Sequence, residues 1–419
     1  MLSVKQAEEI ILELVQPLNE HQDAEIIDLS CAADRILATP VTSQLDFPHW
    51  DNSAMDGYAV RYADVHNCDQ NQPAVLEIIE EIPAGYKPQR SVQSGQAARI
   101  LTGAVMPAGA DTVVMQEQTR REGDRVFILA ASENQAFVRH QGAFYKSGTS
   151  LLPAGIALKA PEIAVLAAAQ CTHLSVYRRL RVAILSTGDE LVTLDQKLQP
   201  GQIVDSNQYA LAALVAQMGA TPLSLGIVPD DPEEIKEAIV QAIASADVVL
   251  SSGGVSVGDY DYVDKILEEL GAEIHIRAVA VKPGKPLTVA TFSGTSDSNQ
   301  KPVLYFGLPG NPVSSLVSFW RFVQPALKKL SGLAAGWEPS FVWARSRHDL
   351  RSDGKRESYL WGRLHLVAGV YEFELASGSH SSGNLINLAQ TNGLAVLPVG
   401  QQFIPSGEQV QVLLLVVSC

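Results

Sequence analysis

Four glycine-containing segments between residues 181 and 320 combine the turns and side chains that bind phosphorylated ligands. They are STGDEL (186–191), SSGGVSVGDYD (251–261), KPGKP (282–286) and GLPGNP (307–312). Each segment follows a short apolar run that predicts a buried strand. Because the carboxyl ends of parallel strands meet at one edge of a sheet, we expect glycine-opened backbone, carboxylates and ammonium groups to gather there.

The glycine loop after the run at 248–250 is the strongest of these signals. Glycine lets backbone N–H groups face a ligand, and a following helix adds its positive end, so that an anion is favoured. A tight strand-to-helix turn without a ligand is the alternative, and the neighbouring acids and lysines favour phosphate binding over it. The expected binding residues of this loop are Gly253, Gly254, Ser256 and Gly258.

Lys282 and Lys285 flank a rigid Pro-Gly pair at the end of another predicted strand. Two ammonium groups on one tight turn can neutralise a phosphate or another oxyanion. The alternative is a solvated turn whose lysines only aid solubility. The position of the turn at the same predicted sheet edge as the glycine loop favours a functional role.

Several acidic residues also come directly after predicted strands. Carboxylates that face phosphates indicate Mg²⁺, a hard cation that prefers oxygen ligands. An ordinary helix cap is the alternative for Asp230, because Pro232 and two glutamates follow it closely. Asp261 belongs to the same group of acids, and the expected metal ligands are Asp189, Glu190, Asp230 and Asp259.

Two further turns have equally plain structural explanations. Asp205-Ser206-Asn207 opens a predicted helix, so capping explains it, and contact of Asp205 and Asn207 with the edge of a heterocycle is the second interpretation. The GLPGNP segment, with Pro309 and Asn311, is a rigid turn for which ligand contact and pure turn chemistry are open alternatives.

Composition limits the class of protein. The chain has 419 residues, enough for two to four domains, and a net charge of -15, which argues against nucleic acid and anionic membrane partners. Four widely spaced cysteines predict free thiols in the cytoplasm, and nine histidines show no zinc-binding spacing. No signal peptide and no apolar run long enough to span a bilayer are visible.

The order of predicted elements indicates a multidomain fold of α/β and β parts. Residues 179–332 alternate strand and helix, which predicts a central, mostly parallel α/β sandwich. We expect an N-terminal helical and extended domain from 1–45 and 141–178, with helices over 4–16 and over the amphipathic run 28–38. Residues 46–140 predict an inserted β-rich domain, and residues 333–419 a C-terminal β-barrel.

The ordered motifs resemble those of the molybdopterin molybdenumtransferases, the group that includes the gephyrin E-type domain. SAMDGYA (53–59), ILTGAVMPAGADTVVMQE (100–117), STGDEL, SSGGVSVGDYD, KPGKP and GLPGNPVS look like family signatures in the expected order, and the match covers essentially the whole chain. The resemblance implies a four-domain subunit that forms a homodimer. Its central domain would be of the molybdopterin-binding type shared with pterin adenylyltransferases.

The implied reaction is insertion of molybdenum from molybdate into adenylylated molybdopterin with release of AMP, the final step of molybdenum cofactor biosynthesis. Mg²⁺ is the expected metal, and transient contacts with the adenylyltransferase and with molybdoenzymes are implied. Two rival functions are a molybdopterin adenylyltransferase, since the α/β domain is so similar, and a non-catalytic scaffold. The extra β domains and SAMDGYA argue against the first rival.

The resemblance also implies roles for single residues. Asp56 and Thr102 look like active-site positions that are presented to the central domain of the other subunit. Arg356 and Ser382 look like contributions of the C-terminal domain, and Arg139 like a family arginine. With the residues above, the expected catalytic set is Asp56, Thr102, Glu190, Asp230, Asp261, Lys282, Lys285 and Arg356.

Two positions depart from the family pattern. Where many members have an Arg-Gly-Glu-Asp run, this chain has Gln141-Gly142-Ala143-Phe144, which lacks the acid. Ala278 stands where a lysine is often found, four residues before KPGKP, and Arg277 is its neighbour and a possible substitute.

Overall fold

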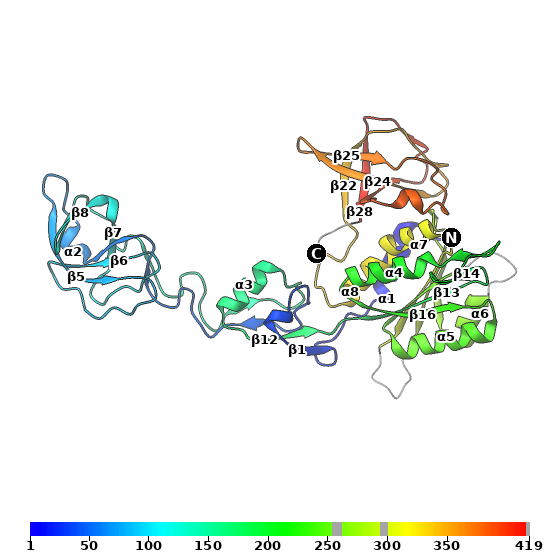
Figure 1. Ribbon diagram of the computed structural model, residues 1–419, viewed down its shortest axis with the longest axis horizontal. Helices are drawn as coiled ribbons and strands as arrows, with labels where there is room; N and C mark the ends of the chain where they lie inside the picture. Colours follow the sequence, from blue (N-terminus) through cyan, green and yellow to red (C-terminus); the bar gives the residue numbers. More distant parts are fainter. Residues whose placement is uncertain (254–261, 294–300, 416–419) are drawn as a thin grey trace. The chain divides into compact units, whose positions relative to one another are not determined.

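The computed structural model describes residues 1–253, 262–293 and 301–415 (Figure 1). Contacts divide the chain into two compact units. The first unit comprises residues 1–39, 154–163 and 172–419, and the second comprises residues 40–153 and 164–171. No helix in the described ranges is long and apolar enough to cross a membrane.

A six-stranded sheet with the order β16-β13-β17-β21-β20-β18 forms the centre of the first unit. Its first four strands are parallel, and the last two continue the sheet in antiparallel fashion. The strands are β16 (Thr221–Val228), β13 (Arg181–Thr187), β17 (Val248–Ser252), β21 (Val303–Leu308), β20 (Pro286–Phe292) and β18 (Glu273–Ala278). The predicted mostly parallel α/β arrangement is confirmed.

Helices cover both faces of this sheet (Figure 1). Alternate residues of β13 face opposite ways, so Val182 and Ile184 share one core with α1 (Val4–Leu14), α4 (Ser206–Gln217) and α7 (Pro312–Ser318). Ala183 and Leu185 share the other core with α5 (Pro232–Ser245) and α6 (Tyr262–Glu269). Burial on both faces explains why the parallel strands are continuous apolar runs.

Local signals set the helix starts. Ser3 and Gln6 form a capping box at α1. Asp205 accepts from the N–H of Gln208 at α4, and Asp231 accepts from two N–H groups at α5. These caps fix where each helix begins relative to the preceding strand.

The C-terminal strands close into a five-stranded barrel, as predicted. Successive neighbours are β24 (Glu357–Val367), β25 (Val370–Leu375), β22 (Phe341–Ser346), β28 (Gln409–Leu414) and β26 (Gly393–Leu397), and pairing of β24 with β26 closes the ring. A short strand, β19 (Val281–Lys282), runs parallel to the start of β24. This ladder attaches the KPGKP turn to the barrel.

The amphipathic run over 28–38 is not a helix, so that prediction is wrong. It begins at the end of β1 (Ala24–Asp28), which pairs with β12 (His173–Tyr177), and continues as a single 3-10 turn over Leu29–Cys31. The backbone then bonds to a distant segment, since the N–H of Leu37 donates to the carbonyl of Ile156 at 3.0 Å. Asp34 has a φ of 62°, which interrupts any helix.

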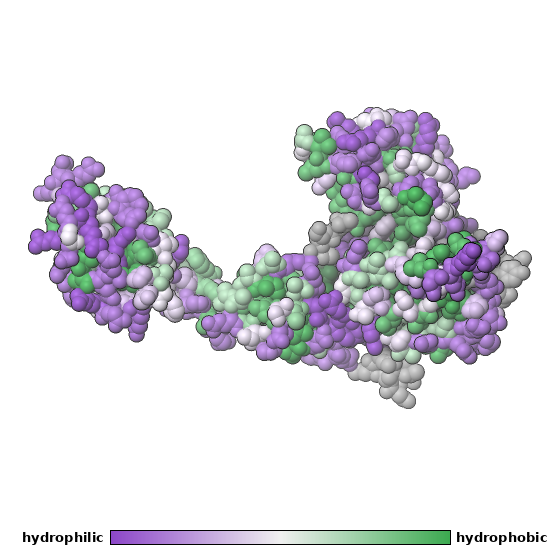
Figure 2. All heavy atoms as spheres, in the orientation of Figure 1, coloured by the Kyte–Doolittle hydropathy of each residue, from purple (hydrophilic) through white to green (hydrophobic). Residues whose placement is uncertain are grey.

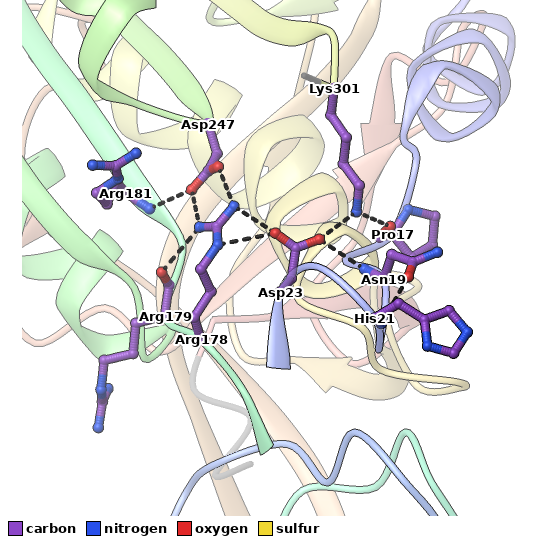
Figure 3. A network of polar contacts seen from close by, with 9 residues as sticks. All are labelled: Pro17, Asn19, His21, Asp23, Arg178, Arg179, Arg181, Asp247 and Lys301. Atoms are coloured by element: carbon purple, nitrogen blue, oxygen red, sulfur yellow. Dashed lines mark hydrogen bonds and ion pairs between the residues drawn. The ribbon is translucent and has the colours of Figure 1, made fainter. Parts of the chain in front are cut away.

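Ion pairs fasten the N-terminal segment to the amino end of the central sheet (Figure 3). The guanidinium of Arg178 donates to both carboxylate oxygens of Asp247 at 2.8 and 2.7 Å, and its Nε donates to Asp23 at 3.0 Å. Lys301 donates to Asp23 at 2.7 Å and to the carbonyl of Pro17 at 2.8 Å. We call these four charged residues the amino-edge clamp.

The second unit is rich in β structure, as predicted for this part of the chain. Its six-stranded sheet has the order β7-β4-β6-β5-β9-β8, and apolar side chains fill two cores that include Val114 and Val113. Figure 2 shows mainly hydrophilic residues on the visible face of this unit. The strands are β4 (Gly57–Val60), β5 (Ala74–Ile82), β6 (Gln96–Ile100), β7 (Thr112–Met115), β8 (Thr119–Glu122) and β9 (Arg125–Ile128).

Short elements complete the fold. They are α2 (Tyr62–Val65), α3 (Ala160–Ala168), α8 (Gln324–Leu330), β2 (Val41–Thr42), β3 (Asn52–Ser53), β10 (Val138–Arg139), β11 (Ser150–Leu152), β14 (Leu191–Val192), β15 (Ile203–Val204), β23 (Leu350–Arg351) and β27 (Phe403–Ile404). Three cysteines of the described ranges, Cys31, Cys68 and Cys171, are free thiols.

Candidate active site

A pocket of about 730 Å³ opens at the carboxyl ends of the parallel strands in the first unit. The ends of β13 and β17 contribute Thr187 and Gly253, and the segment after β16 contributes Asp230. The starts of α4 and α7 also line the wall. Open α/β sheets bind their ligands at this edge, so the pocket is the candidate active site.

Much of the expected site lies in this wall. Two of the acids, the first glycine of the glycine loop, and polar and proline residues of two turns line it, namely Glu190, Asp230, Gly253, Asp205, Asn207, Pro309 and Asn311. Ser382 adjoins the wall residue Gly383, and its carbonyl accepts from the N–H of Val313 at 3.2 Å. The expected residues Gly254, Ser256, Gly258, Asp259 and Asp261 lie outside the described residues.

Gly253 has a backbone conformation that only glycine adopts easily. Its φ is 97°, and a Cβ added there would collide with the carbonyl oxygen of Thr187. The close approach joins the ends of β13 and β17, which form the floor of the pocket. The sequence therefore needs glycine here for packing, whether or not a phosphate binds.

Asn207 is held in one orientation and offers an acceptor. Its Nδ2 donates to Ser252 Oγ at 2.6 Å and to the carbonyl of Gly310 at 2.8 Å. Its Oδ1 is buried and has no hydrogen-bond partner in the described part of the chain. A buried polar atom without a partner costs free energy, so a donor from a ligand would be favoured at this point.

Asp205 combines the two roles that the sequence left open. One carboxylate oxygen caps α4, accepting from the N–H of Gln208 at 3.1 Å. The other, Oδ2, is buried and unpaired within the described ranges, in a residue that is only 3% exposed. Capping and ligand contact are therefore compatible, since Asp205 and Asn207 both line the pocket and each keeps one oxygen without a partner among the described residues.

Two acids, Glu190 and Asp230, line the pocket, and a third, Asp189, contacts Asp230. The N–H of Asp230 donates to Asp189 Oδ1 at 3.1 Å, and Glu190 lines the wall beside them. Partial loss of solvent raises the pKa of Asp230, and the negative charges of Asp189 and Glu190 raise it further. A bound cation would relieve this repulsion.

The described acids do not form a complete metal site by themselves. No group of three or more acidic, histidine or cysteine side chains in residues 1–253, 262–293 and 301–415 is arranged to hold a metal. The carboxylate oxygens that are present suit a hard cation that takes its remaining ligands from phosphate oxygens and water. The donor set therefore fits Mg²⁺ bound together with a phosphorylated ligand.

The KPGKP turn adjoins the pocket. Pro286 lines the wall, whereas the side chains of Lys282 and Lys285 are exposed. Lys282 Nζ donates to Asp353 Oδ2 at 2.9 Å. Arg356 Nη1 donates to the carbonyl of Val281 at 3.0 Å, so this expected catalytic residue is fixed on the same turn.

Asp56 and Thr102 form a hydrogen-bonded pair in the second unit. The N–H and the hydroxyl of Thr102 both donate to Asp56 Oδ1, each at 2.7 Å. These two hydrogen bonds lower the pKa of Asp56, and the charge of Arg99 adds to the effect. Arg139 is exposed on β10, opposite Asn52 of β3.

The departures from the family pattern have plain structural consequences. Phe144 is 74% exposed, at the position where the acid is missing. Arg277 is not available as a substitute for the lysine at Ala278, because its guanidinium is paired with Asp264 and Glu268 of α6. Sequence reasoning also missed Asp353, whose Ser-Asp-Gly context indicates only a turn.

Family models match three consecutive parts of the chain. The MoeA N-terminal region (domain I and II) matches residues 2–169, a probable molybdopterin binding domain matches residues 183–329, and the MoeA C-terminal region (domain IV) matches residues 344–415. The candidate active site lies mainly within the second of these regions.

Curated relatives extend over the whole chain. A protein of Nostoc named molybdopterin molybdenumtransferase is 65% identical over 413 residues, which cover 99% of this chain and 94% of the relative. A protein of Haemophilus influenzae with the same name is 34% identical, with 98% of both chains covered. The crystal structure of a molybdopterin biosynthesis MoeA protein from Pyrococcus horikoshii is similar with a TM-score of 0.83 at 28% identity, covering 99% of this chain and 100% of that one.

Proposed function

The chain belongs to the MoeA family, whose curated members are named molybdopterin molybdenumtransferases, and we propose that it inserts molybdenum from molybdate into adenylylated molybdopterin with release of AMP. The composition of the pocket is the structural observation that supports this proposal. The pocket at the strand ends combines buried acceptors for a heterocycle with acids and an adjoining lysine turn. A pterin that carries phosphate groups needs all three.

The pocket would bind the pterin and its phosphates through different groups. Asp205 Oδ2 and Asn207 Oδ1 would accept hydrogen bonds from the N–H groups of the pterin ring. The backbone at Gly253 would face a phosphate, and we assign the same role to Gly254, Ser256 and Gly258. Pro309, Asn311 and Ser382 would complete this pocket. Arg139, which belongs to the second unit, is proposed as a further binding residue.

Mg²⁺ is part of the proposal. Asp189, Glu190 and Asp230 would hold it together with Asp259, and the bound ion would neutralise charge on the phosphate oxygens. Partial burial raises the pKa of Asp230, and the negative charges of Asp189 and Glu190 raise it further. Cation binding would favour the ionised form of Asp230, and Asp261 would act in the same group.

The transfer is proposed to depend on positioning and charge, with no covalent nucleophile from the protein. Lys282, Lys285 and Arg356 would neutralise the molybdate or a phosphate at the turn beside the pocket. Asp56 and Thr102 would be presented to the central domain of a second subunit, so we also propose a homodimer. We further propose a cytoplasmic enzyme with transient contacts to the pterin adenylyltransferase and to molybdoenzymes.

Full-length similarity to proteins named molybdenumtransferases supports this function over the two rivals. The test is AMP release by the purified protein from adenylylated molybdopterin with Mg²⁺, with and without molybdate. Release that requires molybdate is the expected result. ATP consumption with molybdopterin and no molybdate would indicate an adenylyltransferase, and absence of AMP release under all conditions would indicate a scaffold.

A further inference from the structure

The KPGKP turn is joined to the C-terminal barrel by main-chain pairing. Val281 and Lys282 of β19 pair with Glu357 and Ser358 of β24, and the N–H of Glu357 donates to the carbonyl of Ala280 at 3.0 Å. The barrel residues just before β24 are therefore held beside the turn. They read Ser352-Asp353-Gly354-Lys355-Arg356.

Within this joint, the Asp353 carboxylate contacts one ammonium group and one backbone N–H. Asp353 Oδ2 accepts from Lys282 Nζ at 2.9 Å, and Asp353 Oδ1 accepts from the N–H of Lys355 at 2.9 Å. The backbone bond fixes the carboxylate, so Lys282 is the partner that can leave. The hydrogen bond from Lys282, followed by that from Lys355, lowers the pKa of Asp353, which keeps the carboxylate charged at neutral pH.

The ion pair is placed so that it can open. The side chains of Lys282 and Asp353 are 47% and 35% exposed. Exposed ion pairs add little to stability, because water competes for both partners. The fold itself is held at this point by the β19–β24 ladder and by the bond from Arg356 to Val281. An asparagine could make the same turn bond to the N–H of Lys355, so stability alone does not explain a charged side chain at residue 353.

We propose that Asp353 is an internal competing anion, which occupies Lys282 until an oxyanion displaces it and thereby sets the affinity of the turn for that oxyanion. The inference rests on the proposed function for its ligand, molybdate. It assigns to Asp353 a positioning role: the carboxylate holds the Lys282 ammonium beside the barrel and lowers the positive charge that an incoming anion meets.

The variants Asp353→Asn and Asp353→Glu test this role in the full-length protein. Removing the charge frees Lys282, so Asp353→Asn should lower the dissociation constant for molybdate by about two- to fivefold, the range expected for breaking an exposed ion pair. Asp353→Glu keeps the competing charge and should bind molybdate as the unaltered protein does. Equilibrium dialysis with metal analysis measures the affinity, and sulfate is a second oxyanion probe.

Glu237→Gln is the matched control, since it removes one negative charge from an exposed position on α5. It should leave molybdate binding unchanged, and all three variants should keep the melting temperature. Unchanged or weaker molybdate binding by Asp353→Asn overturns the inference, as does an equal gain in the control or a lowered melting temperature. Absence of AMP release by the unaltered protein would instead contradict the proposed function, so the two failures are distinguishable.

Discussion

The side-chain amide of Asn207 donates to Ser252 Oγ across 2.6 Å, which joins the first turn of α4 to the carboxyl end of β17. The same amide reaches Gly310, so three segments that are far apart in the sequence meet at one side chain. The Oδ1 of the same side chain, which belongs to a residue of the pocket wall, has no partner among the described residues. The geometry of the site therefore depends on an amide at this position.

Asn207→Asp keeps the shape of the side chain and removes both donors. The carbonyl of Gly310 loses its donor, the hydroxyl of Ser252 must become the donor, and a carboxylate is placed at a position that is only 7% exposed. We expect the free energy of unfolding to fall by about 1–3 kcal/mol and AMP release to fall with it. Chemical denaturation and the AMP assay measure the two effects. The exposed Asn71→Asp should change neither, and full activity of Asn207→Asp would contradict the assigned role.

Gly253→Ala should lower the free energy of unfolding in two ways, by backbone strain and by a steric collision. A second variant, Gly271→Ala, measures the backbone strain alone. Gly271 also has a positive φ, of 81°, but an added Cβ meets open space among the described residues. Gly271→Ala should therefore cost about 1 kcal/mol from backbone strain alone. Gly253→Ala adds the collision with Thr187, so we expect about 1–3 kcal/mol more and a loss of activity. Equal unfolding free energies for the two variants would show that the close approach is not required.

The amino-edge clamp predicts a pH dependence of stability. Burial alone would raise the pKa of Asp23, but hydrogen bonds from Asn19 and Lys301 and the charges of Lys301 and Arg178 outweigh it and lower the pKa. A lowered folded pKa means that the stabilisation is present above the unfolded value of about 3.9 and is lost as pH falls through the folded value.

Asp23→Asn should accordingly be less stable than the unaltered protein at pH 7. The difference in unfolding free energy should shrink as the pH falls below about 4. Urea denaturation at a series of pH values measures it. A difference that stays constant down to pH 3 would show that the charge of Asp23 contributes nothing.

Thr102→Val removes one of the two donors to Asp56 and keeps the backbone donor. The pKa of Asp56 should rise, because one of the two hydrogen bonds that lower it is gone. Thr102 is exposed, so stability should be nearly unchanged, while we expect AMP release to fall. Thr102→Ser keeps the hydroxyl and should restore activity. Equal activity of the valine and serine variants would remove Thr102 from the proposed site.

Local patterns were sufficient to predict the central part of the fold. The apolar runs, glycine turns and caps between residues 179 and 332 follow the periodicity of buried strands and capped helices, and the strands and helices that the structure describes there follow that pattern. Asp205 is the clearest case, since one carboxylate performs both the capping and the pocket-lining roles that the sequence left open. The unpaired backbone N–H groups at a helix start favour such capping residues, so a local pattern is enough to predict them.

The same local patterns could not predict contacts between segments that are far apart in the sequence. Residues 28–38 have the spacing of an amphipathic helix, yet their backbone bonds to residues 156–158, which no local pattern indicates. The Lys282–Asp353 pair joins residues 71 positions apart, and the Asp56–Thr102 pair joins residues 46 positions apart. The family resemblance pointed to Asp56 and Thr102, and only the fold reveals Asp353.

The most direct test of the account is a crystal structure of the protein with adenylylated molybdopterin bound. We predict that the pterin ring lies in the pocket at the strand ends, with its N–H groups within hydrogen-bond distance of Asp205 Oδ2 and Asn207 Oδ1, and its phosphates near Gly253 and Glu190. A ligand bound outside this pocket, with those two acceptors still unpaired, would contradict the account.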